Sequence, residues 1–420
     1  MAQIVYLDSV GTGPRFTVAN FADLVVVAGV TVASTDDVAI HVAGGGSDLM
    51  VFGQLFGQST GISLGDQAGL GNNLLVGADG IVSGQSYGVS VYNAGSHLAN
   101  AGQIMSASVG VVVSTNQGGA VQITNSGTIF GDYDGIFASF APGGVVLTNT
   151  GTISTVGGKA YFASSDSTFV DTIHNHGAMI GDVWLAGGSD LYDGRGGMVD
   201  GTVYGEGDDD RFIAGLSAEV FDGGAGNDLL DFTTSTKVTV SLDTAVQGTR
   251  GAEGDTYLNI ENLTGSRNGG DKLYGSAADN HLTGLGGADL LSGGAGNDLL
   301  TGGADKDVLI GGVGNDTFLF NALSEAGDGI RDFGQVVGNN DTIWIGAAGF
   351  GGGLVAGAVA ANQFQVGTDT VALSASVRFI FDTADTTLWF DANGKAAGGL
   401  TLIADLQNGA VVGLSDLWLF

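Results

Sequence analysis

The 420-residue sequence predicts an all-β fold in which a right-handed parallel β-helix, or β-solenoid, continues into a parallel β-roll. Three observations predict it. Two families of internal repeats with different periods cover most of the chain, short apolar segments alternate with turn residues, and 77 Gly stand against only 2 Pro. A repeat of this kind buries its apolar face only against its neighbours, so we expect one continuous solenoid.

The first repeat fills the N-terminal half and has the pattern Asn-x-Gly-x-aliphatic. Copies begin at Asn100, Asn125 and Asn149, with a looser copy at Asn175, so the period is about 25 residues. Asn and Gly tolerate the left-handed backbone that a sharp corner needs. Each copy therefore predicts one rung of a parallel β-helix, and the stacked Asn side chains are expected to form a hydrogen-bonded ladder. Residues 1–50 are expected to form a cap and irregular first rungs.

The second repeat has a period of nine and is cleanest over residues 274–320. Its copies follow the pattern G-G-x-G-x-D-x-U-x, where U is a large apolar residue. The Asp of the pattern is Asp289, Asp298, Asp307 and Asp316 in successive copies. An isolated copy carries Asp228, and looser copies end at Asp48, Asp190 and Asp210. Two departures occur. Asn280, with Asp279 beside it, takes the place of the first Asp, and Asp305, followed by Lys306, replaces the fourth residue of one turn.

Nine residues supply about six of turn and three of strand, which is one half-turn of a roll. The U residues are expected to form the core: Leu282, Leu291, Leu300, Leu309 and Phe318. Turns on one side recur every second repeat, so Asp298 is expected over Asp316, Asp289 over Asp307, and Asn280 below Asp298. Oxygens of two stacked turns, from Asp carboxylates and Gly-rich backbone carbonyls, supply the six to eight ligands that Ca2+ prefers, whereas Mg2+ takes few protein ligands.

The nonapeptide turns therefore predict several Ca2+ ions. The candidate ligands from side chains and backbone are Asp228, Asp279, Asn280, Gly284, Gly286, Asp289, Gly293, Gly294, Gly296, Asp298, Gly302, Asp305, Asp307, Gly311, Gly312, Gly314 and Asp316. Asp, Asn and Gly favour turns in any protein, and one copy would indicate no more than a turn. Five successive turns in strict register favour the metal. Without it the stacked carboxylates would repel, so we expect folding to be coupled to calcium at the weak affinities of extracellular modules.

Composition excludes several classes of partner. The chain has 12 basic against 44 acidic residues, for a formal net charge of -32, which disfavours nucleic acid and anionic membranes. The absence of Cys excludes disulfides, thiolate zinc sites and a Cys nucleophile. No apolar stretch is long enough to predict an integral membrane segment, and the first residues lack the charged and apolar regions of a signal peptide.

The region 187–420 resembles the RTX exoproteins, with a C-terminal half of the serralysin type. Beside the nonapeptides, the resemblance rests on four segments: an insert near residues 231–270 that ends in Ile260-Glu-Asn-Leu-Thr-Gly-Ser, the segment Ile330-Arg-Asp-Phe followed by Asp341-Thr-Ile, the segment Leu388-Trp-Phe-Asp-Ala-Asn-Gly, and the terminal Asp416-Leu-Trp-Leu-Phe. The resemblance implies type I secretion from a Gram-negative bacterium, with the C-terminus recognised by the exporter and the protein ending extracellular or on a cell surface. The terminal segment would also fit an edge strand.

The N-terminal half resembles the Asn-x-Gly-x-Ile repeats of bacterial surface β-helices. Three regions are thus expected: a β-helix at 1–186, a calcium-binding roll with a strand insert at 187–320, and a β-rich secretion region at 321–420. The predicted role is a structural or adhesive protein of a cell surface, surface layer, matrix or filament, whose partners are calcium, a second copy or a cell-surface glycan.

Enzymatic alternatives were weighed against this interpretation. The H-E-x-x-H motif of the serralysin protease domain is absent. A polysaccharide lyase or uronan epimerase would need basic and phenolic side chains around a substrate carboxylate. The only candidate cluster in the β-helix is Lys159, Tyr161, His174, His176 and Arg195, and the two His are more readily explained as surface residues of a strand. A pore-forming RTX toxin would need apolar helices, which the sequence does not predict. The chain is therefore expected not to be an enzyme.

Overall fold

The computed structural model describes residues 3–19, 21–66, 69–164, 168–215, 218–243, 254–334 and 339–420. It divides into two compact units, Met1–Asp228 and Leu229–Phe420, which we call unit 1 and unit 2. Both consist almost entirely of β-strands, most of them in parallel pairs, which confirms the all-β prediction of a parallel β-helix and β-roll. The division at 186 and 320 expected from the repeats stays a prediction. Residues 244–253 of the expected insert lie outside the described part.

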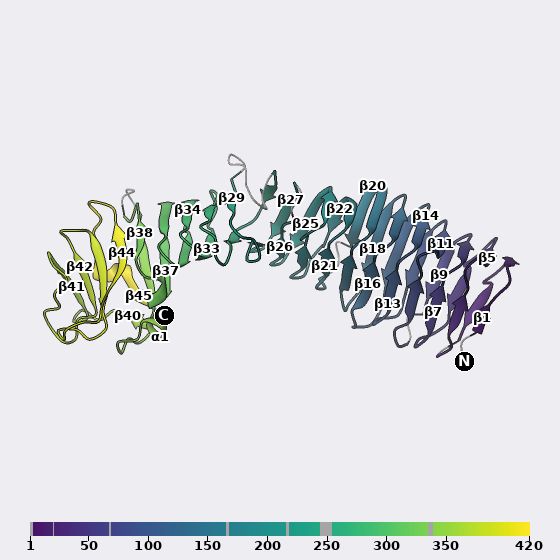
Figure 1. Cartoon of the computed structure of the whole chain (residues 1–420), viewed down its shortest axis with the longest axis horizontal. Helices are drawn as coiled ribbons and strands as arrows, with labels where there is room; N and C mark the ends of the chain where they lie inside the picture. Colours follow the sequence, from purple (N-terminus) through teal and green to yellow (C-terminus); the bar gives the residue numbers. More distant parts are fainter. Residues whose placement is uncertain are drawn as a thin grey trace. The chain divides into compact units, whose positions relative to one another are not determined.

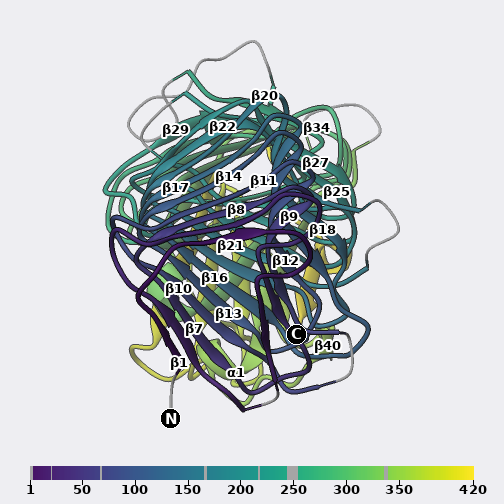
Figure 2. The ribbon, with the colours of Figure 1, turned by 90° about the vertical axis from the view of Figure 1, so that its right-hand side faces the viewer.

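Unit 1 contains three columns of parallel strands, which lie on three faces (Figures 1 and 2). The first column contains β1(Gln3–Val5), β4(Leu24–Val26), β7(Asp48–Val51), β10(Asn73–Val76), β13(His97–Asn100), β16(Val121–Asn125), β19(Val145–Asn149), β21(Thr172–Asn175), β23(Leu191–Asp193) and β26(Arg211–Ile213). The second contains β2(Ser9–Gly11), β5(Thr31–Ser34), β8(Gln54–Gly57), β11(Ile81–Gly84), β14(Gln103–Ser106), β17(Thr128–Gly131), β20(Thr152–Ala163), β22(Ala178–Trp184) and β24(Met198–Asp200).

The third column contains β3(Phe16–Val18), β6(Ile40–Val42), β9(Thr60–Leu64), β12(Tyr87–Val91), β15(Val109–Ser114), β18(Asp134–Phe140), β25(Thr202–Gly207) and β27(Val220–Ala225), together with the second halves of β20 and β22. One rung is thus a strand from each column. Its inward residues stack on those of the next rung, as where Ile104 pairs with Ile129 and Ile129 with Ile153, all fully buried. The periodic aliphatic of the sequence pattern is the core of this stack.

The Gly of each Asn-x-Gly corner is required by the close approach of successive rungs. A Cβ added at Gly127 would lie 2.1 Å from the carbonyl oxygen of Gly102, and one at Gly151 would lie 2.1 Å from that of Gly127. No side chain fits such a gap, so the corner backbone can stack only through glycine.

The expected asparagine ladder is confirmed. The side-chain amide of Asn100 donates to Oδ1 of Asn125 at 2.8 Å, that of Asn125 to Asn149 at 2.8 Å, and that of Asn149 to Asn175 at 2.9 Å. These residues end their strands in the first column and are 0 to 2% exposed. Each buried amide thus has a partner for its oxygen and for its nitrogen, which is the condition for burying it without a large cost.

Replacing Asn149 with Ala is expected to destabilise unit 1 by about 3 kcal/mol, because the amide nitrogen of Asn125 and the carbonyl oxygen of Ala178 would each lose a buried partner. Urea unfolding of the full chain in millimolar calcium, followed by circular dichroism, would measure this loss. Asn73→Ala, at an exposed Asn of the same column, is the control and is expected to change stability by about 0.5 kcal/mol or less. Equal effects of the two substitutions would contradict a stabilising ladder.

Unit 2 contains two sheets. One contains β28(Leu229–Asp231), β31(Asn262–Thr264), β33(His281–Gly286), β35(Leu299–Ala304), β37(Thr317–Ala322), β39(Thr342–Gly346), β45(Leu417–Leu419) and β40(Gly357–Ala358). The other contains β29(Thr239–Ser241), β32(Lys272–Tyr274), β34(Leu290–Ala295), β36(Val308–Val313), β38(Asp328–Ile330), β44(Leu400–Leu406), β43(Thr387–Asp391), β42(Phe379–Asp382) and β41(Phe364–Gly367). The remaining elements are β30(Thr256–Leu258), η1(Leu323–Glu325), α1(Ala347–Phe350) and η2(Leu414–Asp416).

The nonapeptides form a roll because successive repeats alternate between these sheets. Leu282 pairs with Leu300 in one sheet and Leu291 with Leu309 in the other, each eighteen residues apart. All five predicted core residues of the roll are fully buried, as expected. After the last repeat, β45 pairs in parallel with β39, so the final segment of the chain is a strand of the first sheet. Because β45 also pairs in antiparallel fashion with β40, it lies inside the sheet: the expectation of a strand at residues 416–420 is confirmed, but its expected place at the edge of the sheet is wrong.

Candidate metal centre

Two rows of buried polar residues line the turns of unit 2, each residue directly ahead of a strand or, at Asp328, at its first position. The first row is Asn280, Asp298, Asp316 and Asp341, and the second row is Asp271, Asp289, Asp307 and Asp328. Within each row, a backbone N–H donates to Oδ1 of the next member, as from Asp298 to Asp316 at 2.9 Å and from Asp289 to Asp307 at 2.8 Å. All eight are at most 4% exposed. The stacking of Asn280, Asp298 and Asp316, and of Asp289 and Asp307, is therefore as the register predicted.

The second carboxylate oxygen is unsatisfied in most of these side chains. Oδ2 of five members is buried and accepts no hydrogen bond: Asp289, Asp298, Asp307, Asp316 and Asp328. A buried anionic oxygen without a partner costs several kcal/mol, and native proteins rarely leave one so. Five in consecutive turns indicate that a partner belongs to these turns, and an anionic oxygen requires a cation or a proton.

In these turns, the Oδ2 atom of the Asp lies close to the Cα of a glycine in the same turn. A Cβ built at Gly293 would lie 2.1 Å from Oδ2 of Asp298 and 2.6 Å from the carbonyl oxygen of Gly311, and one at Gly284 would lie 2.3 Å from Oδ2 of Asp289 and 2.5 Å from the carbonyl oxygen of Gly302. Gly302 and Gly311 stand in the same relation to Asp307 and Asp316. Carboxylate and carbonyl oxygens of stacked turns thus gather where only glycine fits.

The second and fourth residues have positive φ in the four turns that end at Asp289, Asp298, Asp307 and Asp316. The values are 111° and 109° at Gly294 and Gly296, and 106° and 143° at Gly312 and Gly314. Asp305 takes the fourth place of its turn at 80° and keeps the same backbone form. Its side chain and that of Asp279 are exposed, away from the buried rows, and Oδ1 of Asp279 accepts from the backbone of Asn297 at 2.6 Å. Gly286, in the third place of its turn, packs against the carbonyl of Arg267.

Among the residues that the structure describes, no three His, Cys, Asp or Glu side chains converge on one point. A metal in these turns must therefore take most of its ligands from backbone carbonyls, with the row carboxylates supplying the charge. Such an all-oxygen set suits Ca2+, which accepts six to eight oxygens in flexible geometry, and does not suit zinc or copper.

Comparison with known families decides the nature of these turns. Residues 195–230, 267–300 and 283–318 match the RTX calcium-binding nonapeptide repeat, in a form with four copies. The chain contains RTX calcium-binding repeats. RTX nonapeptides bind several Ca2+ ions, and RTX repeat proteins are typically secreted by Gram-negative bacteria. No catalytic family is indicated. No curated protein is similar enough to the chain to count as a match.

The repeat pattern of the sequence did not identify three members of the two rows as turn residues: Asp271, Asp328 and Asp341. Asp328 follows Asp307 by 21 residues and Asp341 follows Asp316 by 25, outside the eighteen-residue register. Each precedes a buried apolar residue by two positions (Leu273, Ile330 and Ile343), and this shared Asp-x-apolar step is the signal that would have found them. Asp271, Asn280 and Asp341 differ from the other members, because a side-chain oxygen of each accepts from a backbone N–H shortly before it, that of Ser266, Ser276 and Gly334 respectively.

Burial raises the pKa values of the RTX carboxyls. It raises the pKa of Asp298 to about 7, with the charges of Asp316 and Asp279 adding to the effect and the N–H of Asn280 opposing it. It likewise raises the pKa of Asp289 to about 7, of Asp307 and Asp316 to about 6, and of Asp328 to about 8. The folded metal-free roll therefore holds protons more tightly than the unfolded chain, whose Asp pKa is about 3.9.

Because the folded state binds more protons, the metal-free roll is expected to lose stability as pH rises from about 4 to about 8, and to regain it on acidification. Calcium displaces these protons, so its affinity is expected to change in the opposite sense and to rise with pH. Thermal unfolding of resin-decalcified protein at pH 5 and pH 8 measures the first effect. Asp298→Asn is expected to reduce the difference in stability between pH 5 and pH 8, whereas Asp385→Asn, at an exposed site, is not. A metal-free roll more stable at pH 8 would contradict this assignment.

The candidate catalytic residues of unit 1 are not brought into one site. Tyr161 is fully buried, and its hydroxyl donates to Asp171 at 2.7 Å. Lys159 lies over the rings of Phe162 and Trp184, at 3.9 and 4.5 Å from their centroids. These residues belong to β20 and β22, whereas the two His belong to the first column and its corner.

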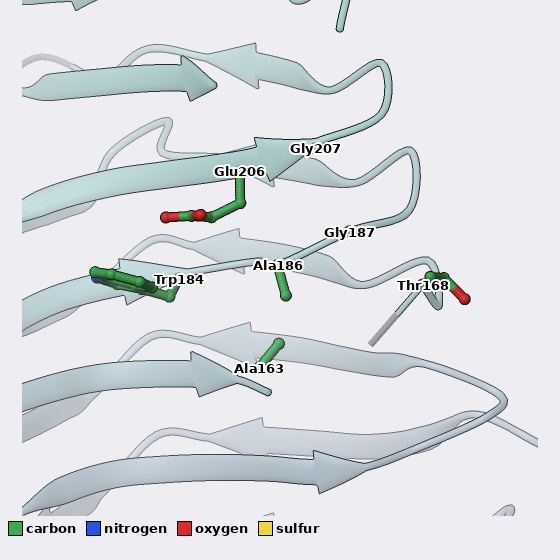
Figure 3. A pocket seen from close by; sticks show the side chains of 7 residues that line it. All are labelled: Ala163, Thr168, Trp184, Ala186, Gly187, Glu206 and Gly207. Carbon is green, nitrogen blue, oxygen red and sulfur yellow. The ribbon is translucent and has the colours of Figure 1, made fainter. Parts of the chain in front are cut away.

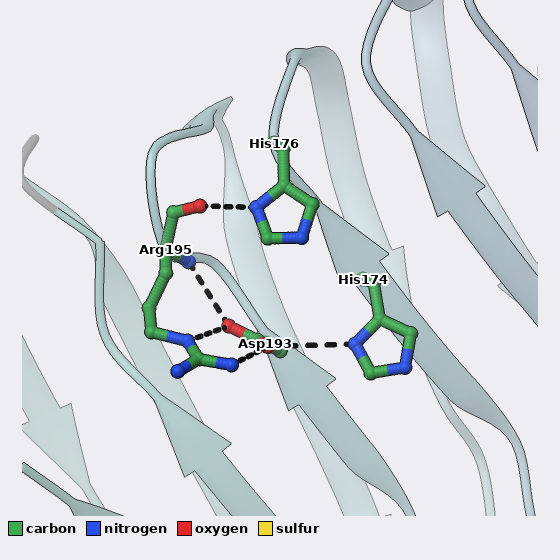
Figure 4. A network of polar contacts seen from close by, with 4 residues as sticks. All are labelled: His174, His176, Asp193 and Arg195. Atoms are coloured by element: carbon green, nitrogen blue, oxygen red, sulfur yellow. Dashed lines mark hydrogen bonds and ion pairs between the residues drawn. The ribbon is translucent and has the colours of Figure 1, made fainter. Parts of the chain in front are cut away.

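His174 and Arg195 both contact the carboxylate of Asp193, and His176 contacts the backbone carbonyl of Arg195 (Figure 4). The Arg195 guanidinium holds the pKa of Asp193 below its usual value against the effect of burial. His174 therefore belongs to a polar network on the surface of a strand, and His176 lies at the corner that follows the strand. Of the two explanations that the sequence offered, this agrees with the simpler one, that the two His are surface residues.

A pocket of about 270 Å³ lies beside this region in unit 1 (Figure 3). Its lining is mostly small and apolar: Ala163, Thr168, Trp184, Ala186, Gly187, Glu206 and Gly207. Among the described residues that line the pocket, Glu206 has the one titratable side chain, whereas lyase chemistry calls for an acid and a base. In the described part of the chain, no helix has the length and apolar character needed to cross a membrane.

Proposed function

We propose that this protein is a secreted structural or adhesive repeat protein whose RTX roll folds on calcium after export. The observation that supports this most is the two rows of buried Asp side chains with unsatisfied Oδ2 atoms in unit 2. Burying so many carboxylates without counter-ions opposes folding, and calcium removes that opposition. Calcium is scarce in cytosol and millimolar outside, which matches the weak affinities of extracellular modules.

The proposal of export rests on the resemblance of the C-terminal region to that of secreted RTX proteins. Residues 321–420 would serve a type I exporter while unfolded and then pack as strands, as β45 does against β39. Residues 1–186 would form the extended surface of the mature protein. This division, and location outside a Gram-negative cell or on its surface, belong to the proposal.

Contact with a second copy or a cell-surface glycan is the proposed use of that surface. The first rungs of unit 1 expose large apolar side chains, among them Leu7 at 81% and Phe21 at 72%. Exposed apolar groups gathered in one region are typical of interaction sites. Parallel rungs also offer strand edges, through which such stacks can associate.

Sedimentation and electron microscopy of the full chain, with and without millimolar calcium, test the proposal. Calcium-dependent sheets or filaments, or calcium-dependent retention on a cell-surface glycan, are the expected results. Leu7→Ser with Phe21→Ser is expected to reduce self-association without changing the number of bound ions. A monomer that binds no glycan in either condition would contradict the proposal, as would the release of unsaturated sugars from an acidic polysaccharide.

A further inference from the structure

Four aromatic side chains form a row on the outer face of the third column of unit 1. Phe137 pairs in register with Phe162, Phe162 with Trp184, and Trp184 with Tyr204, so each successive rung supplies one ring. Neighbouring ring centroids are 5.1, 6.2 and 4.9 Å apart. Each ring is half-buried, whereas the residue directly before it in the sequence is fully buried in the core. We call these four residues the aromatic row.

The backbone beneath the aromatic row is already hydrogen-bonded within the column. Strand β20 pairs with β18 and β22, β22 pairs with β20 and β25, and β25 pairs with β22 and β27. A peptide therefore cannot join these strands as an added strand, which is a common way for a sheet to bind one. A ligand on this face must be bound through side chains.

Polar side chains flank the row on both sides. On one side, Lys159 pairs in register with Asp182, and its Nζ lies 3.9 and 4.5 Å from the ring centroids of Phe162 and Trp184. On the other side, Glu206 follows Tyr204 by two residues of the same strand and is exposed. An apolar strip with hydrogen-bonding groups along both margins is complementary to a chain of sugars, whose rings combine apolar C–H faces with hydroxyls around the rim.

The pocket of Figure 3 lies at one end of this strip, and both Trp184 and Glu206 line it. Its volume of about 270 Å³ is below the roughly 300–1,000 Å³ that is typical of sites for whole small molecules. It therefore suits one ring of a longer ligand. Figure 3 shows the Glu206 carboxylate extending toward the side of the pocket on which Trp184 lies. A carboxylate that accepts from hydroxyls, beside an aromatic ring that contacts C–H groups, can orient a sugar ring.

Glu206 occupies its place in the pocket at an energetic cost. Its φ is 77°, in the left-handed region that is unfavourable for residues other than Gly. The residue paired with it in the next rung is Gly224, which has a φ of 96°. Local strain of this kind gathers at functional sites. A long acidic side chain at a position that favours Gly thus points to a use for the carboxylate.

The charges around the row select the class of ligand. Residues 16–158 contain no Lys or Arg, so Lys159 is the first basic residue after Arg15. Asp182 lies beside it, and Glu206, Asp208 and Asp209 are exposed near the far end of the row. This acidic surrounding repels nucleic acid, anionic lipid and acidic polysaccharide. A neutral ligand rich in hydroxyls is compatible with it, since carboxylates accept hydrogen bonds from hydroxyls.

We propose that the aromatic row binds a neutral, extended glycan along the rungs, with one sugar ring in the pocket between Trp184 and Glu206. Rungs of a parallel stack lie about 4.7–4.9 Å apart, and the rings of an extended β-linked glycan repeat at a similar spacing. Successive sugars can therefore contact successive aromatic side chains. This inference rests on the proposed adhesive function and deepens it, because it names the class of glycan and its site.

Affinity electrophoresis of the full chain in millimolar calcium tests the proposal. Native gels contain hydroxyethyl cellulose or glucomannan, which are neutral and extended, carboxymethyl cellulose, which has the cellulose backbone with added negative charge, or dextran, which is neutral and flexible. We expect at least one of the two neutral, extended polymers to retard the protein. Carboxymethyl cellulose and dextran are expected to retard it about tenfold more weakly or not at all.

Variants locate the site. Trp184→Ala and Glu206→Gln are each expected to weaken the retardation about tenfold or more, whereas Trp344→Ala, at an exposed Trp of unit 2, is expected to keep it. Glu206→Gly separates binding from folding, because Gly fits the positive φ. It is expected to keep or raise the Tm and still to weaken the retardation. Amide exchange over β20 and β25 shows whether Trp184→Ala remains folded.

The outcomes distinguish this inference from the proposed function. Retardation that Trp184→Ala and Glu206→Gln leave intact would overturn the site while the proposed function stands. No retardation by either neutral, extended polymer, or equal retardation by carboxymethyl cellulose or dextran, would overturn the class of ligand. Sedimentation with and without calcium then decides whether the proposed function survives through self-association. If Trp184→Ala abolishes self-association and not glycan binding, the row is an interface between copies and the inference is wrong.

Discussion

Replacing Asp298 and Asp307 together with Asn is expected to remove most of the stabilisation that calcium gives unit 2. Each side chain lies in a different row and ends in a buried, unsatisfied Oδ2. An ion at 100 times its dissociation constant stabilises by about 2.7 kcal/mol, so losing two or more ions is expected to lower the calcium-loaded Tm by about 10 to 20 °C. Scanning calorimetry of the full chain at fixed calcium would measure this shift.

The same double variant is expected to be more stable than the natural chain when both are metal-free. Neutral amides avoid the burial of charge, which is the main cause of the raised pKa values of Asp298 and Asp307, and they also avoid the repulsion from neighbouring carboxylates that adds to it. Opposite effects in the two conditions cannot result from a simple packing defect. Asp369→Asn with Asp385→Asn, at exposed positions, is the control. A double variant that keeps the full calcium-dependent rise in Tm would contradict the assignment of these oxygens as ligands.

Replacing Gly293 with Ala is expected to destabilise the calcium-loaded roll by about 3 kcal/mol and to weaken calcium binding. The new Cβ would overlap Oδ2 of Asp298 at 2.1 Å and the backbone oxygen of Gly311 at 2.6 Å, and a backbone atom cannot move aside without shifting the next turn. Urea unfolding in millimolar calcium gives the change in stability, and a calcium titration gives the change in affinity.

Gly367→Ala is the matched control in the same unit, because a Cβ there meets nothing closer than 3.6 Å. It is expected to alter stability by about 0.5 kcal/mol or less and to leave calcium binding unchanged. If Gly293→Ala behaved like this control, the close gathering of oxygens around Gly293 would have no energetic role.

The repeats predicted much of the architecture because each repeat contacts mainly the repeats next to it. The nine-residue register placed Asp298 against Asp316 and buried Leu282, Leu291 and the other core residues, as the structure has them. The corner pattern likewise predicted the ladder from Asn100 to Asn175. These predictions succeed because residues one repeat apart lie in adjacent strands, so their contacts follow from the period.

Members of the rows outside the period were harder to find. Asp328 and Asp341 follow loops of other lengths, so counting by eighteen does not reach them, although their Oδ1 atoms accept from Asp307 and Asp316 as in the regular turns. Asp279 and Asp305 are the opposite case. The repeat places them correctly in their turns, but their side chains are exposed. The position of a residue in the repeat therefore predicts its backbone conformation in the turn. It does not predict whether the carboxylate is buried in the row.

The candidate cluster of Lys159, Tyr161 and the two His shows why nearness in sequence is a weak guide on a solenoid. Neighbouring residues of a strand face opposite sides, so Tyr161 enters the core while Phe162 lies outside it. Lys159, two residues before Tyr161, also lies outside the core, because the strand register shifts between these two residues where β20 pairs with β22. The partner of Tyr161, Asp171, belongs to the following rung and had drawn no attention in the sequence.

Amide hydrogen exchange of the full chain, with and without calcium, tests most directly whether the buried Asp rows require calcium to fold. In millimolar calcium, we expect slow exchange throughout strands β32 to β38. After calcium is removed at pH 8, we expect these strands to exchange rapidly, while β13, β16 and β19, which the asparagine ladder joins, stay protected. Equal protection of β32 to β38 in the two conditions would contradict calcium-dependent folding of the roll.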